Sequence, residues 1–191
     1  MKFSLKGKSV YFLPAVFLLA LLWLLSSYRG VSGRFLVATP QVAVSPFEKS
    51  VIYVVHHDLY RAYGFIINKK VPATDTGEHT IREIPGAPAL YGGPIKYPAW
   101  VYILSRGPGG WPLFYPEPGP RYDGRNGMIE DARTLGDARV LAGQTGWGPL
   151  QLNLEIGRGS WEVIDYDPAL LFDTPLGEIW DEALSRVEKK E

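Results

Sequence analysis

The sequence contains no cysteine. Disulfide bonds, thiol nucleophiles and thiolate metal sites are therefore excluded. The chain also lacks the glycine-rich phosphate loops of nucleotide-binding proteins and the Gly-x-Ser-x-Gly elbow of serine hydrolases. These absences exclude several large classes of enzyme, and we predict no cofactor.

The chain has no excess of positive charge. It carries 20 basic and 20 acidic residues, and four of the basic ones, Lys2, Lys6, Lys8 and Arg29, lie in the first 32 positions. Residues 33–191 therefore hold 16 basic residues against 20 acidic ones, a net charge of −4. Phosphate contacts supply most of the non-specific affinity for nucleic acids, so nucleic acid is not an expected partner of this part of the chain.

Charged residues are also missing from one long and mostly apolar stretch, residues 9–28. A helix of 20 residues is about 30 Å long, which matches the hydrocarbon core of a bilayer. The stretch predicts a transmembrane helix through which the membrane is a partner of the chain. A cleaved signal peptide is the alternative, because Gly30 and Ser32 have the −3/−1 spacing of a cleavage site.

The basic residues around this stretch predict an orientation. Lys2, Lys6 and Lys8 precede it, and Arg29 and Arg34 follow it. The positive-inside rule then places the N-terminus in the cytoplasm and the domain outside. The predicted localisation is a single-pass protein of the inner (cytoplasmic) membrane. The predicted parts are a basic tail (1–8), a transmembrane helix (9–28), a short linker (29–32) and one domain (33–191).

The composition of residues 33–191 is that of one folded domain. Aromatic residues make up 13% of the chain and charged residues 21%, which argues against disorder. The 21 glycines and 16 prolines indicate many turns and short elements. Such a composition favours a β-rich α+β fold over a helical bundle.

Runs of β-branched and aromatic residues predict six strands, at 34–39, 50–57, 62–68, 99–105, 139–144 and 160–166. Only residues 58–61 separate the second run from the third, which predicts a hairpin. Apolar residues recur at helical spacing in 174–187, with Thr174 as the expected N-cap and Pro175 at the first helical position. A short helix is expected at 130–135, and long loops at 69–88 and 106–127.

The three histidines are the first candidates for chemistry. Adjacent residues of a strand point to opposite faces, so His56 and His57 cannot both ligate one metal ion without distortion. A metal site would also need His79 and a carboxylate, and we predict none. An imidazole and the carboxylate of Asp58 could act as base and acid if they converge in a cleft.

Two glycine-containing motifs are candidates for close backbone contacts. Gly92-Gly93-Pro94 predicts a tight turn, with the approach of a ligand as the alternative. In Gly146-Trp147-Gly148 the glycines flank a tryptophan, so the backbone there can bend sharply and approach another group closely. Residues 149–156 alternate in hydrophobicity like a strand, although Pro149 could open a helix, and periodicity leaves the choice open.

Several motifs follow one another along residues 33–191. They are Gly33-Arg34-Phe35-Leu36-Val37-Ala38-Thr39-Pro40, Pro46-Phe47, Ser50-Val51, His57-Asp58, Gly64-Phe65-Ile66-Ile67-Asn68, Gly92-Gly93-Pro94, Gly146-Trp147-Gly148-Pro149, Gln151-Leu152, Glu155-Ile156, Phe172-Asp173 and Trp180. No single motif is decisive. As an ordered set they resemble the YqgE/AlgH family of bacterial proteins.

The resemblance implies one α+β domain in which a β-sheet folds into a half-barrel with a few short helices around it. It favours a helix for residues 149–156, and it implies no established catalytic residue. The family motifs supply candidate binding residues, which are His57, Asp58, Asn68, Gly92, Gly93, Gly146, Trp147, Gly148, Gln151 and Glu155.

The chain departs from the family pattern at three places. Arg61-Ala62-Tyr63-Gly64 stands where the family resembles Gly-Ala-Met-Gly, Leu150 replaces a glycine, and Ser105 stands where a histidine often ends a strand. If those family residues serve a shared site, this protein has altered it.

These features lead to one leading hypothesis for the function and two alternatives. The leading hypothesis is a membrane-anchored, non-enzymatic binding or regulatory domain for a protein partner or a small ligand. The alternative is an enzyme of unknown reaction with an acid/base site at His57, Asp58, Asn68 and Glu155. A transcriptional regulator, a label attached to part of the family, is disfavoured by the net charge of the domain.

Overall fold

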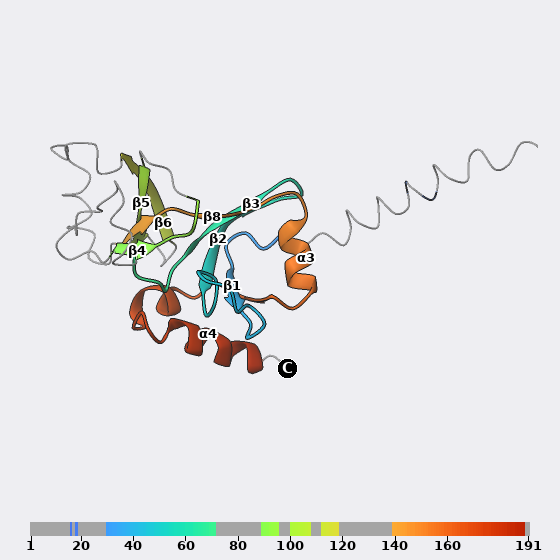
Figure 1. Cartoon of the computed structure of the whole chain (residues 1–191). Helices are drawn as coiled ribbons and strands as arrows, with labels where there is room; N and C mark the ends of the chain where they lie inside the picture. Colours follow the sequence, from blue (N-terminus) through green and yellow to red (C-terminus); the bar gives the residue numbers. More distant parts are fainter. Residues whose placement is uncertain are drawn as a thin grey trace, which may run out of the picture. The chain divides into compact units, whose positions relative to one another are not determined.

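The computed structural model describes residues 16, 18, 30–71, 89–95, 100–107, 112–118 and 139–189 (Figure 1). The chain divides into two compact units, Met1–Gly30 and Val31–Glu191. In the first unit the description is confined to Val16 and Leu18, which are helical and exposed, and to Gly30.

The membrane-spanning helix predicted at residues 9–28 lies outside the described residues, apart from two positions. Among the residues that are described, no helix is long and apolar enough to cross a membrane. The longest described helix has ten residues and is about 15 Å long, half the thickness of the hydrocarbon core. We therefore correct the predicted localisation: on this finding a single-pass protein of the inner membrane is wrong.

Five strands form the first sheet, in the order β8-β3-β2-β1-β9, and all neighbouring pairs are antiparallel. Most of these strands consist of β-branched, leucine and aromatic residues that fit a pleated surface buried on both sides. The bounds are β1 (Phe35–Ala38), β2 (Val51–His57), β3 (Ala62–Ile66), β8 (Thr145–Trp147) and β9 (Trp161–Ile164).

Four strands form the second sheet, in the order β4-β7-β5-β6, with β4 and β7 parallel and the other pairs antiparallel. The N–H of Ile66 on β3 donates to the carbonyl of Gly92, which directly follows β4, and this backbone hydrogen bond joins the two sheets. The bounds are β4 (Ala89–Tyr91), β5 (Trp100–Arg106), β6 (Pro112–Pro118) and β7 (Arg139–Ala142).

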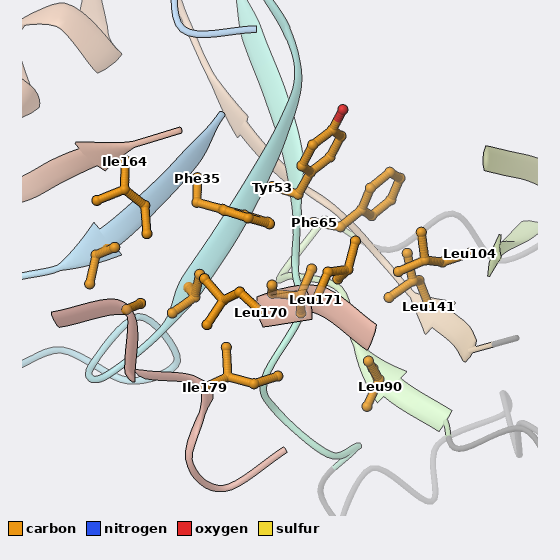
Figure 2. Close-up of a cluster of buried hydrophobic side chains, with 14 residues drawn as sticks. Phe35, Tyr53, Phe65, Leu90, Leu104, Leu141, Ile164, Leu170, Leu171 and Ile179 are labelled. Carbon is orange, nitrogen blue, oxygen red and sulfur yellow. The ribbon is translucent and has the colours of Figure 1, made fainter. Parts of the chain in front are cut away.

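Both faces of the first sheet are covered, because alternate residues of its strands enter two separate cores. On one face Phe35 packs with the π-helical turn η2 (Ala169–Asp173) and with α4 (Ile179–Glu188). Figure 2 shows this core, in which Phe35, Tyr53 and Phe65 face Leu170, Leu171 and Ile179. On the other face Leu36 packs in a core that includes Leu152 of α3 (Gln151–Gly157). The two helices thus cover opposite faces (Figure 1).

The predicted α+β class, dominated by sheet and with few helices, is confirmed. The described strands form two open sheets, and the finer description as one half-barrel stays a prediction. All six predicted strands are present, with ends that differ by no more than two residues. Residues 58–61 connect β2 and β3 as the predicted hairpin. The helix predicted at 130–135 lies outside the described residues.

Three strands were not predicted, namely β4, β6 and β8. Strand β6 falls in the predicted loop 106–127, and its prolines hide the alternation of a strand. It lies at the edge of its sheet, where a missing N–H donor is tolerated.

The C-terminal helix begins four residues later than predicted, at Ile179 instead of Pro175. Glu178 is the N-cap of α4, while Thr174 has extended backbone and donates its hydroxyl to the carbonyl of Ala169. Thr174 thus closes η2, and a separate turn from Pro175 to Glu178 precedes α4. The predicted apolar stripe is confirmed, since its five members pack on the core shown in Figure 2. They are Leu176, Ile179, Trp180, Leu184 and Val187.

Candidate functional site

Half of the ten candidate residues lie around α3 and the turn that leads into it. The N-cap Leu150 has a φ of 57°, a left-handed conformation that favours glycine. The N–H of Gly148 donates to Oε1 of Gln151 over 3.1 Å, and the N–H of Gln151 donates back to the Gly148 carbonyl over 3.2 Å. This reciprocal pair fixes the turn between β8 and α3.

The carboxylate of Glu155 joins α3 to two strands. Its Oε2 accepts the indole N–H groups of Trp147 on β8 and Trp161 on β9, each over 2.8 Å. Its Oε1 accepts a hydrogen bond from Nε2 of Gln151 over 2.9 Å. Both indoles are buried, and their rings meet edge to face with centroids 6.3 Å apart. A buried indole N–H requires an acceptor, and Glu155 serves two of them.

His57 is buried at the end of β2 and joins this strand to α3. Its Nδ1 accepts the backbone N–H of Val31 over 3.2 Å, so Nδ1 carries no proton. Its Nε2 must then carry the proton of the neutral ring, and it donates to Oδ1 of Asn153 over 3.0 Å. Burial lowers the pKa of His57, against the opposing effects of the Asn153 hydrogen bond and the charge of Asp58. The geometry and the pKa shift both describe a neutral imidazole.

Asp58 does not face His57 but organises the turn between β2 and β3. Its Oδ1 accepts the N–H groups of Tyr60 and Arg61, and its Oδ2 lies 2.8 Å from Nε2 of His56. The His56 hydrogen bond, followed by those of the two N–H groups, lowers the pKa of Asp58 to about 2. The partner of Asp58 at this strand end is therefore His56, and the hydrogen-bonded pair lies at the surface.

Asn68 lies at the opposite end of β2 from His57. Its Oδ1 accepts the N–H of Val51, and its Nδ2 donates to the carbonyl of Lys49, each over 2.9 Å. Val51 and His57 are the first and last residues of β2, so about 20 Å of strand separates them. Asn68 and His57 therefore cannot take part in one proton-transfer step.

The candidate glycines allow close contact between backbone segments of the protein itself. A Cβ on Gly92 would lie 2.3 Å from the carbonyl oxygen of Gly143, and one on Gly93 would lie 2.3 Å from the backbone of Gln144. A Cβ on Gly146 would lie 2.8 Å from Cδ1 of Ile95. The close approach predicted for these motifs is thus made by neighbouring segments of the chain.

The structure brings five of the candidates to one helix. Trp147, Gly148, Gln151 and Glu155 share a hydrogen-bond network, and His57 reaches α3 through Asn153. Asn153 and Trp161 were not predicted. A helix at residues 149–156 could have indicated them, because polar groups on the buried side of a helix need hydrogen-bond partners. An indole N–H is a suitable donor for such a group.

Within the described ranges, no three histidine, aspartate or glutamate side chains are grouped so that they could hold a metal ion. His79 lies outside those ranges. The candidate site thus consists of a hydrogen-bond network that holds α3 on the sheet and of the hydrogen-bonded pair His56–Asp58 at the surface.

The sequence from residue 35 to residue 190 matches the family model DUF179, described as AlgH-like. A UPF0301 protein of Anaeromyxobacter dehalogenans (strain 2CP-1) is 32% identical over 180 residues, which cover 83% of this chain and 88% of that protein. A UPF0301 protein of Coxiella burnetii (strain Dugway 5J108-111) is 33% identical over 168 residues, with 82% and 89% covered. One of Streptomyces coelicolor is 28% identical over 181 residues, with 85% and 89% covered.

Two solved structures share the fold. The solution structure of the AlgH protein from Pseudomonas aeruginosa superposes with a TM-score of 0.59 at 23% identity, covering 84% of this chain and 90% of that one. A crystal structure of a Corynebacterium diphtheriae protein gives a TM-score of 0.61 at 20% identity, covering 83% and 88%. At these identities the likeness shows the fold alone. The family match over most of the chain, together with relatives above 30% identity, shows that the chain belongs to the AlgH-like family.

Proposed function

We propose that residues 31–191 form a non-enzymatic binding or regulatory domain of the AlgH-like type. One observation carries the proposal: the carboxylate of Glu155 accepts hydrogen bonds from three side chains of its own domain. A carboxylate offers about four lone-pair directions, and three are occupied here. The most prominent acidic group of the candidate site thus supports a helix.

The other titratable candidates are engaged in the same way. His57 uses Nδ1 for Val31 and Nε2 for Asn153, and Asp58 accepts hydrogen bonds from its own turn and from His56. An acid/base enzyme needs a proton donor or acceptor that can reach a substrate. These hydrogen bonds support a scaffold that holds α3 in a fixed position on the sheet.

The outward side of α3 is the surface that this scaffold presents. Leu154 is 57% exposed on it, between the buried Leu152 and the bonded Glu155. Leu154 thus offers an apolar side chain to solvent on a helix that is held in place by the hydrogen bonds of Glu155 and Asn153. We therefore propose this side of α3 as the binding surface.

The first test replaces Glu155 by Gln, which keeps the shape but turns one acceptor oxygen into an NH₂ donor. We expect a loss of about 2 kcal/mol in the free energy of unfolding, or about 6 °C in Tm for a domain of this size. Removing a catalytic group usually leaves stability unchanged or raises it. An unchanged or raised Tm would therefore favour the enzyme hypothesis. Glu162→Gln, at an exposed position of the neighbouring β9, is the matched control.

The second test concerns binding. The purified full chain, tagged at its C-terminus, is incubated with cell extract beside the variants Leu154→Asp and Glu162→Gln. We expect at least one protein or small molecule to be enriched by the native chain and by Glu162→Gln, and lost with Leu154→Asp. No enrichment by the native chain, or equal enrichment by all three, would contradict the proposal.

A further inference from the structure

The segment Val31–Gly33, here called the lead-in segment, connects residues 1–30 to β1 along the chain. It is held against β2 by three groups. The N–H of Val31 donates to Nδ1 of His57, the hydroxyl of Ser32 accepts the backbone N–H of His57 over 2.7 Å, and the N–H of Gly33 donates to the carbonyl of Val54 over 2.8 Å. The side chain of Val31 is buried in the core beside α3.

The bond between Val31 and His57 depends on the protonation state of the ring. A backbone N–H is only a donor, so it can bind Nδ1 only while that nitrogen keeps its lone pair. A proton on Nδ1 places two donors opposite each other and adds a positive charge. The bond from Nε2 to Asn153 does not change, because Nε2 carries its proton in both states.

We propose that His57 is a pH-sensitive switch, in which protonation of Nδ1 releases Val31 and loosens the lead-in segment while α3 stays bound through Asn153. Histidine is the side chain whose charge changes in the physiological range of pH. The switch changes how the chain enters the domain, and it does not depend on what the domain binds.

Among the described residues, two charged or titratable side chains act on the pKa of His57. On its own strand and the following turn these are His56 and Asp58, which act in opposite directions on the pKa of His57. The described neighbours on the other elements include the uncharged residues Asn153 of α3, Ser32 of the lead-in segment and Ala62 of β3. Burial lowers the pKa of His57, so the switch operates below pH 6.5.

The test follows the ring of His57 and the amide of Val31 in the same sample by NMR. In the full chain, labelled with ¹⁵N and ¹³C, the ring signals and the amide hydrogen-exchange protection are recorded from pH 7.5 downwards, after correction for intrinsic exchange. We expect the protection of Val31 to fall about tenfold as the ring titrates, because one hydrogen bond is lost and repulsion between two donors is added. The amide of Ile52, inside the β1–β2 ladder, should stay protected.

Two results would overturn the proposal. One is constant protection of Val31 through the titration of the His57 ring. The other is a ring that stays neutral until the whole domain unfolds, with Val31 and Ile52 losing protection together.

Two variants separate this switch from a general effect of pH. Asn153→Asp places a carboxylate at Nε2, which favours the imidazolium, and should move the Val31 midpoint upwards by about one pH unit or more. His56→Gln removes the neighbouring imidazole and should keep the Val31 response. Loss of the response in His56→Gln, or an unmoved midpoint in Asn153→Asp, would contradict the assignment to His57.

Discussion

The indole Nε1 of Trp180 on α4 donates to the backbone carbonyl of Ala38 on β1 over 2.8 Å, although 142 residues separate the two in the sequence. Ala38 follows the last residue of β1 that is paired in register with β2. The helix therefore supplies a donor where the ladder stops supplying one. This bond fixes α4 on the face of the first sheet shown in Figure 2.

Replacing Trp180 by Phe tests this relationship. Phenylalanine keeps an aromatic ring against the core but leaves the Ala38 carbonyl without the indole donor. We expect the free energy of unfolding to fall by about 1–2 kcal/mol, measured from the urea midpoint at an unchanged slope. Tyr60→Phe, at a position that is 77% exposed, should leave the midpoint unchanged. Equal midpoints for the two variants would refute the role of the indole bond.

The left-handed backbone of Leu150 predicts a stabilising glycine. The left-handed conformation costs a residue with a Cβ roughly 1–2 kcal/mol, whereas glycine adopts it freely. Leu150→Ala serves as the control, because it removes the same side chain and keeps the Cβ. We expect Leu150→Gly to be more stable than Leu150→Ala by about 1 kcal/mol in urea unfolding. The reverse order would show that the turn does not hold this conformation.

The contact between Gly92 and Gly143 predicts a severe effect of one added methyl group. A Cβ on Gly92 would lie 2.3 Å from the carbonyl oxygen of Gly143, which cannot move away without separating the ends of the paired strands β4 and β7. We expect Gly92→Ala to lower the free energy of unfolding by about 3 kcal/mol or more, measured by thermal or urea unfolding. Gly157→Ala is the matched control, because no atom lies within 4 Å of the added Cβ at the end of α3. It should be neutral or stabilising by up to about 1 kcal/mol.

The fold was predictable where one local pattern decides the structure. The β-branched and aromatic composition of β2 and the spacing of the stripe from Leu176 to Val187 indicate their elements without knowledge of the rest. Prediction failed where tertiary contacts decide. Thr174 has the composition of an N-cap but closes η2, and β6 contains prolines that only an edge position tolerates.

The candidate site was only partly predictable for a similar reason. The family motifs include Trp147, Gln151 and Glu155, and these residues do lie together. Which neighbour each one contacts depends on the direction of the side chain. His57 and Asp58 are adjacent in sequence, yet His57 ends β2 and bonds α3, whereas Asp58 begins the turn and accepts the N–H groups of that turn.

The ion pair of Asp58 with His56 predicts a shifted titration. The carboxyl of Asp58 should titrate near pH 2, because its anion accepts hydrogen bonds from His56, Tyr60 and Arg61. Its contribution to stability is present above the unfolded pKa of 3.8 and is lost as the pH falls towards 2. His56→Gln should raise the pKa towards its ordinary value, as followed by the carboxyl ¹³C shift. An unchanged pKa in that variant would assign the shift to the turn alone.

The depressed pKa of His57 predicts the opposite dependence of stability on pH from that of a histidine in an ion pair. Below pH 6.5 the unfolded chain binds a proton at this position that the native chain does not bind, so stability falls as the pH is lowered from 6.5 through the native pKa. Above pH 6.5 both states are neutral and the contribution is constant. Urea midpoints should therefore change little between pH 7.5 and 6.5 and decrease between pH 6.5 and 5.5 in the native chain.

Replacing His57 by Gln removes the titrating group and should flatten this part of the curve, even if the variant is less stable at every pH. His56→Gln, which changes the neighbouring, partly exposed imidazole, should keep the decrease. The comparison depends on slopes rather than on absolute stabilities, so the loss of the hydrogen bonds of His57 does not obscure it. An equal decrease in the native chain and in His57→Gln would assign the pH dependence to other groups and would remove the energetic basis of the proposed switch.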